Sequence, residues 1–158
     1  MRIGVTGHMD ITEDTRRLVF DALWDLLRER ASDSLVGVSC LARGADSVFA
    51  EAVLSVGGAL EVVLPSRDYR AAKVKPDHAD QFDALLSRAS RVLIMAHDHA
   101  SRDAYEAANE AVLGGVDELM AVWDGKAGSR SGTADVVAAA RGRGLAVTVI
   151  WPAGAARE

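Results

Sequence analysis

The chain has 158 residues, 49% of them hydrophobic and 26% charged, and this size and apolar content suit one globular domain with its own core. Its formal net charge of -5 excludes a general attraction to nucleic acid or to anionic membrane surfaces, so a bound anion needs a local site. The single cysteine, Cys40, excludes an internal disulfide framework and fits a reducing compartment.

No run approaches eighteen apolar residues, and the N-terminal residues lack the pattern of a signal peptide. We therefore expect a cytoplasmic protein with no membrane partner. One domain is expected over residues 1–152, followed by a frayed tail over residues 153–158.

Short apolar runs alternate along the chain with longer amphipathic segments, which is typical of alternating strands and helices. The first run, residues 2–6, precedes a helix over residues 13–30, in which Val19, Leu23 and Leu27 recur on one face and Thr12 is the expected N-cap. Further strands are expected at residues 35–40, 60–64, 91–95, 118–123 and 146–150, and further helices at residues 46–56, 79–89, 103–113 and 133–143.

Six strands alternating with five helices predict repeated βαβ units with right-handed crossovers. The expected fold class is α/β, a Rossmann-like three-layer sandwich around a six-stranded parallel sheet of order about 3-2-1-4-5-6. In such a sheet, ligands bind beyond the carboxyl ends of the strands, where the strand order reverses. The loops after strands 1, 2, 4 and 5 are therefore the candidate site.

The loop LARGAD, residues 41–46, stands between an expected strand and an alanine-rich helix. Gly44 lets backbone come close to a ligand, and the helix that opens near Asp46 offers unpaired N–H groups to an anion. Arg43 adds a forked, permanently charged donor suited to phosphate. The alternative is a solvated surface arginine beside an ordinary turn.

The last loop of this kind, SRSGTAD over residues 129–135, repeats the arrangement. Ser131, Gly132 and Thr133 supply hydroxyl groups and bare backbone before a helix, although an ordinary helix cap has the same composition. Asp135 could hold a ribose hydroxyl or act as a catalytic carboxylate, but an acidic residue is favoured in a first helical turn in any case.

Other features are less specific. His8 follows the first strand and could bind a ribose or phosphate, or only pack beside the loop. Residues 97–99, HDH, do not have the spacing of a metal site, and neither dinucleotide-binding GxGxxG nor a P-loop occurs, so we expect no metal and no resident cofactor. Residues 66–76 carry four basic residues and one acidic residue, and could form a basic lid.

Residues 39–65, SCLARGADSVFAEAVLSVGGALEVVLP, resemble the SGLARGAD…A…GG…AVLP segment of the Smf/DprA DNA-processing proteins. The alternation from GVTGHM to VIWP resembles the SLOG superfamily of Rossmann-like proteins, which also contains the LOG phosphoribohydrolases. The resemblance implies a bound nucleotide or nucleotide derivative, with phosphate near the glycine-containing loops, and a homodimer. Placement and resemblance together give these ligand-binding candidates: Thr6, Gly7, His8, Arg43, Gly44, Ala45, Asp46, Ser131, Gly132 and Thr133.

The LOG enzymes carry a PGGxGTxxE pattern in which glycines cradle phosphate and the glutamate helps to cleave an N-glycosidic bond. Here Gly132 and Thr133 match the GT pair, GSRS replaces PGGx, and Val136 stands at the glutamate position, with Asp135 one residue away. The sequence therefore predicts a sensor or binding module for a nucleotide.

The alternative function is a phosphoribohydrolase-type enzyme that cleaves the N-glycosidic bond of a nucleoside monophosphate. Its carboxylate would be Asp135, or another acid of the crevice such as Asp46 or Glu106. A third hypothesis is single-stranded DNA binding through residues 66–76. The acidic balance of the chain argues against it, and we do not expect a nucleic acid partner.

Overall fold

The computed structural model describes residues 1–30, 34–128 and 132–158. Within these residues, strands and helices alternate and all strand pairs are parallel. The strands are β1 (Arg2–Gly7), β2 (Val36–Ser39), β3 (Ala59–Leu64), β4 (Arg91–Ile94), β5 (Glu118–Val122) and β6 (Ala146–Ile150). The helices are α1 (Glu13–Arg30), α2 (Ala45–Ser55), α3 (Tyr69–Lys73), α4 (Pro76–Ser87), α5 (Arg102–Gly114) and α6 (Thr133–Gly142).

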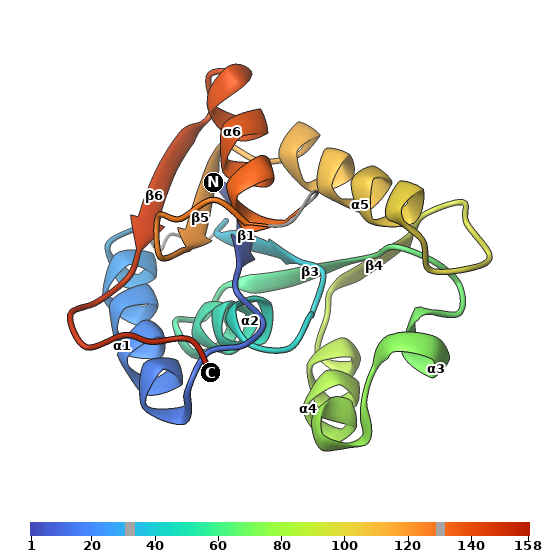
Figure 1. The fold of residues 1–158 in the computed structure, drawn as a ribbon, viewed down its shortest axis with the longest axis horizontal. Helices are drawn as coiled ribbons and strands as arrows, with labels where there is room; N and C mark the ends of the chain where they lie inside the picture. Colours follow the sequence, from blue (N-terminus) through green and yellow to red (C-terminus); the bar gives the residue numbers. More distant parts are fainter. Residues whose placement is uncertain (31–33, 129–131) are drawn as a thin grey trace.

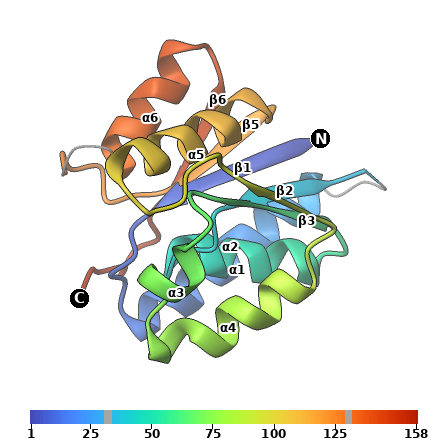
Figure 2. The same ribbon diagram turned by 90° about the vertical axis from the view of Figure 1, so that its right-hand side faces the viewer.

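The helices cover the two faces of the sheet. Helices α1, α2 and α4 lie on one face and α5 and α6 on the other (Figures 1 and 2). This arrangement is a three-layer Rossmann-like sandwich, and the expected fold class is confirmed.

The strand order in the sheet is β4-β3-β2-β1-β5-β6. The expected neighbours 3-2-1 and 5-6 are present, while β4 lies outside β3 at the edge of the sheet rather than between β1 and β5. The chain therefore runs outward from β1 to β4, crosses back, and continues with β5 and β6 on the other side of β1. This places the reversal of strand order between β1 and β5.

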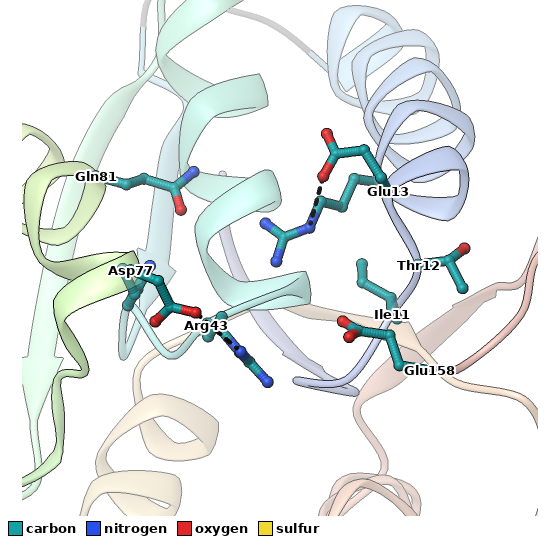
Figure 3. A pocket seen from close by; sticks show the side chains of 9 residues that line it. Ile11, Thr12, Glu13, Arg43, Asp77, Gln81 and Glu158 are labelled. Atoms are coloured by element: carbon teal, nitrogen blue, oxygen red, sulfur yellow. Dashed lines mark ion pairs between the residues drawn. The ribbon is translucent and has the colours of Figure 1, made fainter.

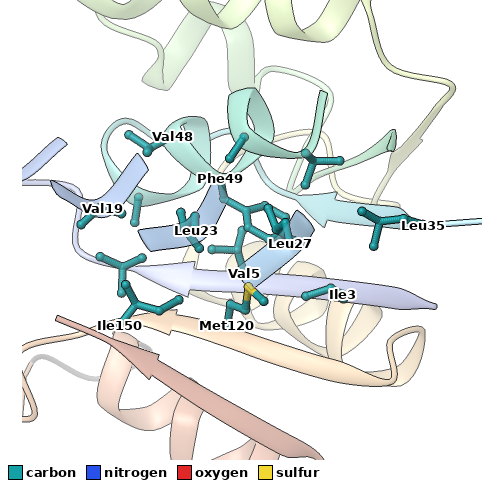
Figure 4. Packing of buried hydrophobic residues seen from close by; sticks show 14 residues of the cluster. Ile3, Val5, Val19, Leu23, Leu27, Leu35, Val48, Phe49, Met120 and Ile150 are labelled. Atoms are coloured by element: carbon teal, nitrogen blue, oxygen red, sulfur yellow. The ribbon is translucent and has the colours of Figure 1, made fainter. Parts of the chain in front are cut away.

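The largest core cluster lies between the sheet and helices α1 and α2 (Figure 4). The expected stripe of α1 is buried there, since Val19, Leu23 and Leu27 have no exposed surface. Thr12 is the N-cap of α1, because its Oγ1 accepts a hydrogen bond from the amide of Thr15 at 3.2 Å. The stripe facing the sheet explains why the sequence period located this helix.

Strand β4 is exposed, although its apolar sequence is also typical of a buried parallel strand. Val92, Leu93 and Ile94 are 42%, 39% and 47% exposed. An edge strand has a neighbour on one side only, and here that neighbour is β3. The apolar side chains of β4 are thus left in contact with solvent.

The basic segment over residues 66–76 is not a loop throughout. It contains the short helix α3, and Pro76 begins α4 at a position where a missing amide proton costs little. In Figure 2, α3 lies near the same end of the molecule as the C-terminus.

The C-terminal residues 153–158 are paired with the chain rather than frayed. The amide of Thr12 donates to Ala156 O at 3.2 Å, and the amide of Ala156 donates to Thr15 Oγ1 at 2.8 Å. Ile11 and Arg157 form an antiparallel bridge. Composition alone predicted fraying because PAGAARE offers little apolar surface, but backbone hydrogen bonds to the segment before α1 hold it. Among the helices that the structure describes, none combines the length and hydrophobicity of a membrane span.

Candidate ligand-binding cleft

A cleft of about 810 Å³ opens at the carboxyl ends of the central strands. It lies beside β1 and β5, where the strand order reverses and where ligands of open parallel sheets bind. Of the residues expected from the sequence, those that line it are Thr6, Gly7, His8, Asp46, Gly132 and Thr133. Ser131 lies outside the described residues.

Gly44 brings two loops of the protein together, rather than backbone and ligand. Its φ is +81°, and a Cβ at this position would lie 2.6 Å from the carbonyl oxygen of His8 and 2.7 Å from that of Met9. The amide of the next residue, Ala45, donates to His8 O at 3.1 Å. The glycine of LARGAD is therefore required by the close approach of the segment after β1.

Arg43 lines a different, smaller pocket of about 380 Å³ (Figure 3). Its Nη1 lies 3.5 Å from Asp77 Oδ2, and in the same pocket Arg16 Nε lies 3.7 Å from Glu13 Oε2. Glu158 adds a further carboxylate. The cation that the sequence assigned to phosphate thus lies outside the cleft, in a pocket with acidic partners.

Asp46 is a buried acid at the cleft, with 8% of its surface exposed. Its Oδ2 accepts a hydrogen bond of 3.3 Å from the amide of Ala42. Burial raises the pKa of this carboxyl from 3.8 to about 7, against the lowering effect of the Ala42 hydrogen bond. A carboxyl group that titrates near neutral pH can serve as either a hydrogen-bond donor or an acceptor.

His8 lines the cleft and is held by the segment that follows β5. Its Nε2 accepts a hydrogen bond from the amide of Asp124 at 3.1 Å, and the Asp124 Oδ1 lies 3.2 Å from the same nitrogen. The imidazole also meets the Trp151 ring edge-on, with 5.6 Å between centroids. Because Nε2 is occupied, only the other side of the ring remains for a ligand.

The N-terminus of α6 forms the opposite wall. Gly132 is the N-cap, without a side-chain cap, and Gly132, Thr133 and Ala134 all line the cleft. Amides in a first helical turn have no partner within their own helix, and they carry the positive end of the helix dipole. Asp135 is exposed and is not among the lining residues. The structure therefore favours backbone groups here over the Asp135 carboxylate.

The cleft is basic although the chain is acidic. Its lining contains five Lys or Arg residues and two Asp residues, in a chain of net charge -5. Within the described residues, Arg157 pairs with Asp10 at 2.8 Å, whereas the four other basic residues form no ion pair. These four are Lys73, Lys75, Arg102 and Lys126.

The segment over residues 66–76 divides its basic residues between the cleft and the surface. Arg67 pairs with Asp98 at 2.8 Å and Arg70 pairs with Asp83 at 2.8 Å, both at the surface. The two lysines of the segment line the cleft instead. Of the basic residues that the sequence assigned to a lid, Lys73 and Lys75 therefore line the cleft, whereas Arg67 and Arg70 do not.

Sequence reasoning missed an aromatic wall. Tyr69 and Tyr105 line the cleft with their rings at 80° and 6.4 Å between centroids, and Asn109 lies beside them. Burial raises the pKa of the Tyr69 hydroxyl well above its usual range, and the charge of Asp46 adds to this effect. The basic character of the segment around Tyr69 was the only signal in the sequence.

No family model matches the sequence, and no curated protein matches it significantly. Solved structures do. DNA processing protein A (DprA) from Streptococcus pneumoniae superposes with a TM-score of 0.71 at 20% identity, over 97% of this chain and 51% of that chain. DprA from Helicobacter pylori, a single-stranded DNA binding protein, superposes with a TM-score of 0.67 at 17% identity, over 99% of this chain and 68% of that chain. The Moco carrier protein of Chlamydomonas superposes with a TM-score of 0.57 at 18% identity, over 94% of this chain and 74% of that chain.

These matches define the class of fold. The chain has the Rossmann-like fold of these proteins, as the resemblance implied. It spans about half the length of the pneumococcal protein. At these identities the likeness concerns the fold, and the function must be argued from the cleft.

Proposed function

We propose that this chain binds a nucleotide or nucleotide-derived ligand in the cleft, as a cytoplasmic sensor or binding module. The observation that carries the proposal is the excess of basic over acidic residues in the cleft of an acidic chain. Four of these cations lack an ion pair within the described residues, so a bound anion would supply the missing charge.

The phosphate is best placed at the N-terminus of α6. Gly132 offers bare backbone, Thr133 a hydroxyl group, and Lys126 a nearby ammonium group in the same loop. Residues 123–126 are held in shape, because Trp123 Nε1 donates to Lys126 O at 2.9 Å and the Lys126 amide donates to Asp124 Oδ1 at 3.0 Å. Tyr105, which is only partly buried, then offers ring surface to a base, whereas the buried Tyr69 supports it.

Calorimetric titration with AMP, GMP, CMP and UMP tests this proposal. At least one should bind, and Lys126→Ala should weaken it by about 1.5–3 kcal/mol, as expected for the loss of a charged hydrogen bond. Arg17→Ala, on the exposed side of α1, is the matched control and should leave binding unchanged. Absence of heat with all four nucleotides, or an equal loss in the two variants, would contradict the proposal.

A second candidate is the N-glycosidase, and the observation that favours it is Asp46. This carboxyl group lines the cleft and has a pKa near neutrality, as a general acid requires, whereas Asp135 lies outside the lining. If the chain is this enzyme, Asp46→Asn should abolish release of free base from the bound nucleotide while Asp135→Asn should not.

Single-stranded DNA is the ligand of one protein with this fold, and this stands partly against our expectation that nucleic acid is not a partner. The cations of the cleft would serve a DNA strand as well as a nucleotide. A short oligothymidylate is the probe, and its affinity should fall steeply with salt if several phosphates are bound. We favour the nucleotide because Arg67 and Arg70, which would extend the basic track, are already paired.

A further inference from the structure

Asp46 has hydrogen-bonding capacity that the protein does not use. Oδ2 accepts the amide of Ala42, but Oδ1 makes no hydrogen bond within the described residues. No Lys or Arg pairs with this carboxyl group there, although it is more than nine-tenths buried. Among the described residues no fully buried side-chain oxygen or nitrogen lacks a hydrogen-bond partner, so Oδ1 is accessible from the cleft that Asp46 lines, where a ligand can reach it.

The partner of Asp46 is not a phosphate. The amide of Ala45, at the start of α2, is consumed by His8 O. A carboxyl group at this helix end repels an anion once it ionises. Cys40 and Tyr69, whose pKa values the charge of Asp46 raises, are the other titratable groups beside it. A neutral group that donates hydrogen bonds suits this environment.

Asp46 and the proposed phosphate site lie on opposite sides of β1. Strand β2 precedes the loop of Asp46 and strand β5 precedes α6, and these two strands flank β1. Asp46, Gly132 and Thr133 line one cleft. In a nucleoside monophosphate, the two ribose hydroxyls are neutral donors and lie closer to the 5′-phosphate than the amine of the base does.

We infer that Asp46 accepts hydrogen bonds from the ribose hydroxyls of the ligand and so fixes its orientation, with the phosphate at α6. The inference rests on the proposed function and names the ligand class more closely, as a nucleotide with a free ribose diol. Carboxylates that follow the second strand play this part in dinucleotide-binding Rossmann folds.

A ligand pair tests the inference. Dissociation constants of AMP and of 2′,3′-dideoxyadenosine monophosphate are measured on the wild type, Asp46→Asn and Lys126→Ala. At pH 8, where the Asp46 carboxyl is ionised, the wild type should prefer AMP by about 10- to 100-fold, the range expected for hydrogen bonds to a charged group. In Asp46→Asn, whose neutral amide oxygen accepts more weakly, the preference should fall to a few-fold at most. Lys126→Ala is the matched control at the phosphate end. It should lower the affinity for both ligands by the same factor and so keep the preference for AMP.

The outcomes separate the inference from the proposed function. Equal affinity of the wild type for both ligands would overturn the inference and leave nucleotide binding in place. No binding of either ligand would overturn the two together. Loss of the preference in Asp135→Asn rather than in Asp46→Asn would assign the hydroxyls to Asp135 and also overturn it. The wild-type comparison decides the matter even if Asp46→Asn does not fold.

Discussion

The α-carbon of Gly44 lies so close to His8 that a Cβ on it would stand 2.6 Å from the His8 carbonyl oxygen. This contact joins the segment after β1 to the start of α2, and so places His8 and Asp46 in one cleft. The glycine of the LARGAD motif thereby shapes the cleft without lining it.

We expect Gly44→Ala to lower the free energy of unfolding by about 2–4 kcal/mol, because it adds a backbone clash to a positive φ. Gly57→Ala is the matched control, since Gly57 has a φ of +86° but no atom within 4 Å of an added Cβ, and it should cost only about 1–2 kcal/mol. Urea unfolding measures both values. Equal losses would show that the contact with His8 is not important.

Arg43→Ala should have little effect on nucleotide binding, in contrast to Lys126→Ala. Arg43 faces Asp77 in the smaller pocket, whereas Lys126 lines the cleft. Titration of both variants with the same nucleotide gives the comparison. A large loss in Arg43→Ala would restore the assignment made from the motif and would move the phosphate towards α2.

Asp46 should make the stability depend on pH. The folded carboxyl holds its proton up to about pH 7, whereas the unfolded one releases it near its usual pKa of 3.8. The folded state therefore binds more protons in this window, and the contribution of Asp46 to stability falls as the pH rises from about 4 to about 7.

Asp46→Asn removes this pH dependence. Relative to the wild type, the free energy of unfolding of the variant should therefore rise by up to about 4 kcal/mol as the pH increases across the same window. Urea unfolding at several pH values measures the difference between the two curves. Parallel curves would mean that the carboxyl group is solvated and titrates normally.

Cys40 should react slowly with thiol reagents in the native state. Cys40 is partly buried where it lines the cleft, and the loss of solvent around its thiol raises the pKa well above the usual range, with a further rise from the charge of Asp46. The thiolate is the reactive form, so the native protein holds little of it at pH 8. The rate of the Cys40 reaction is measured from the colour that a disulfide reagent releases, with and without denaturant. Equal rates in the two conditions would contradict it.

The homodimer that the resemblance implies has a candidate edge in β4. Its apolar side chains are exposed, and an antiparallel pair of two β4 strands would satisfy their outward backbone groups. Leu93→Lys should then yield monomers in light-scattering measurements, while Val149→Lys on the opposite edge strand should not. The same mass for wild type and Leu93→Lys would place any dimer contact elsewhere.

Much of the fold follows from sequence periodicity. The stripe of α1 and the β-branched runs predicted the elements closely, because burial against a sheet imposes these patterns. The place of β4 did not follow, since a short apolar run such as RVLI reads the same at the edge as in the centre. Only the packing of the neighbouring helices decides which strand is covered.

The site was predictable as a region rather than by side chains. The loops after β1, β2 and β5 do meet at the cleft, and Asp46, His8 and Thr133 line it. The direction of Arg43 was not predictable, because a residue in a tight turn can face either side of it. Lys126 was missed as a lining residue because it lies outside the motifs, and its position depends on the hydrogen bond of its amide to Asp124.

Proton NMR of the protein mixed with AMP tests the central claim most directly. Saturation transferred from the protein to the AMP protons, lost in Lys126→Ala and accompanied by no free adenine over several hours, is the result that nucleotide binding in the cleft predicts. No transfer, or transfer that Lys126→Ala leaves unchanged, would contradict it. Appearance of adenine with ribose 5-phosphate would instead make the chain an enzyme.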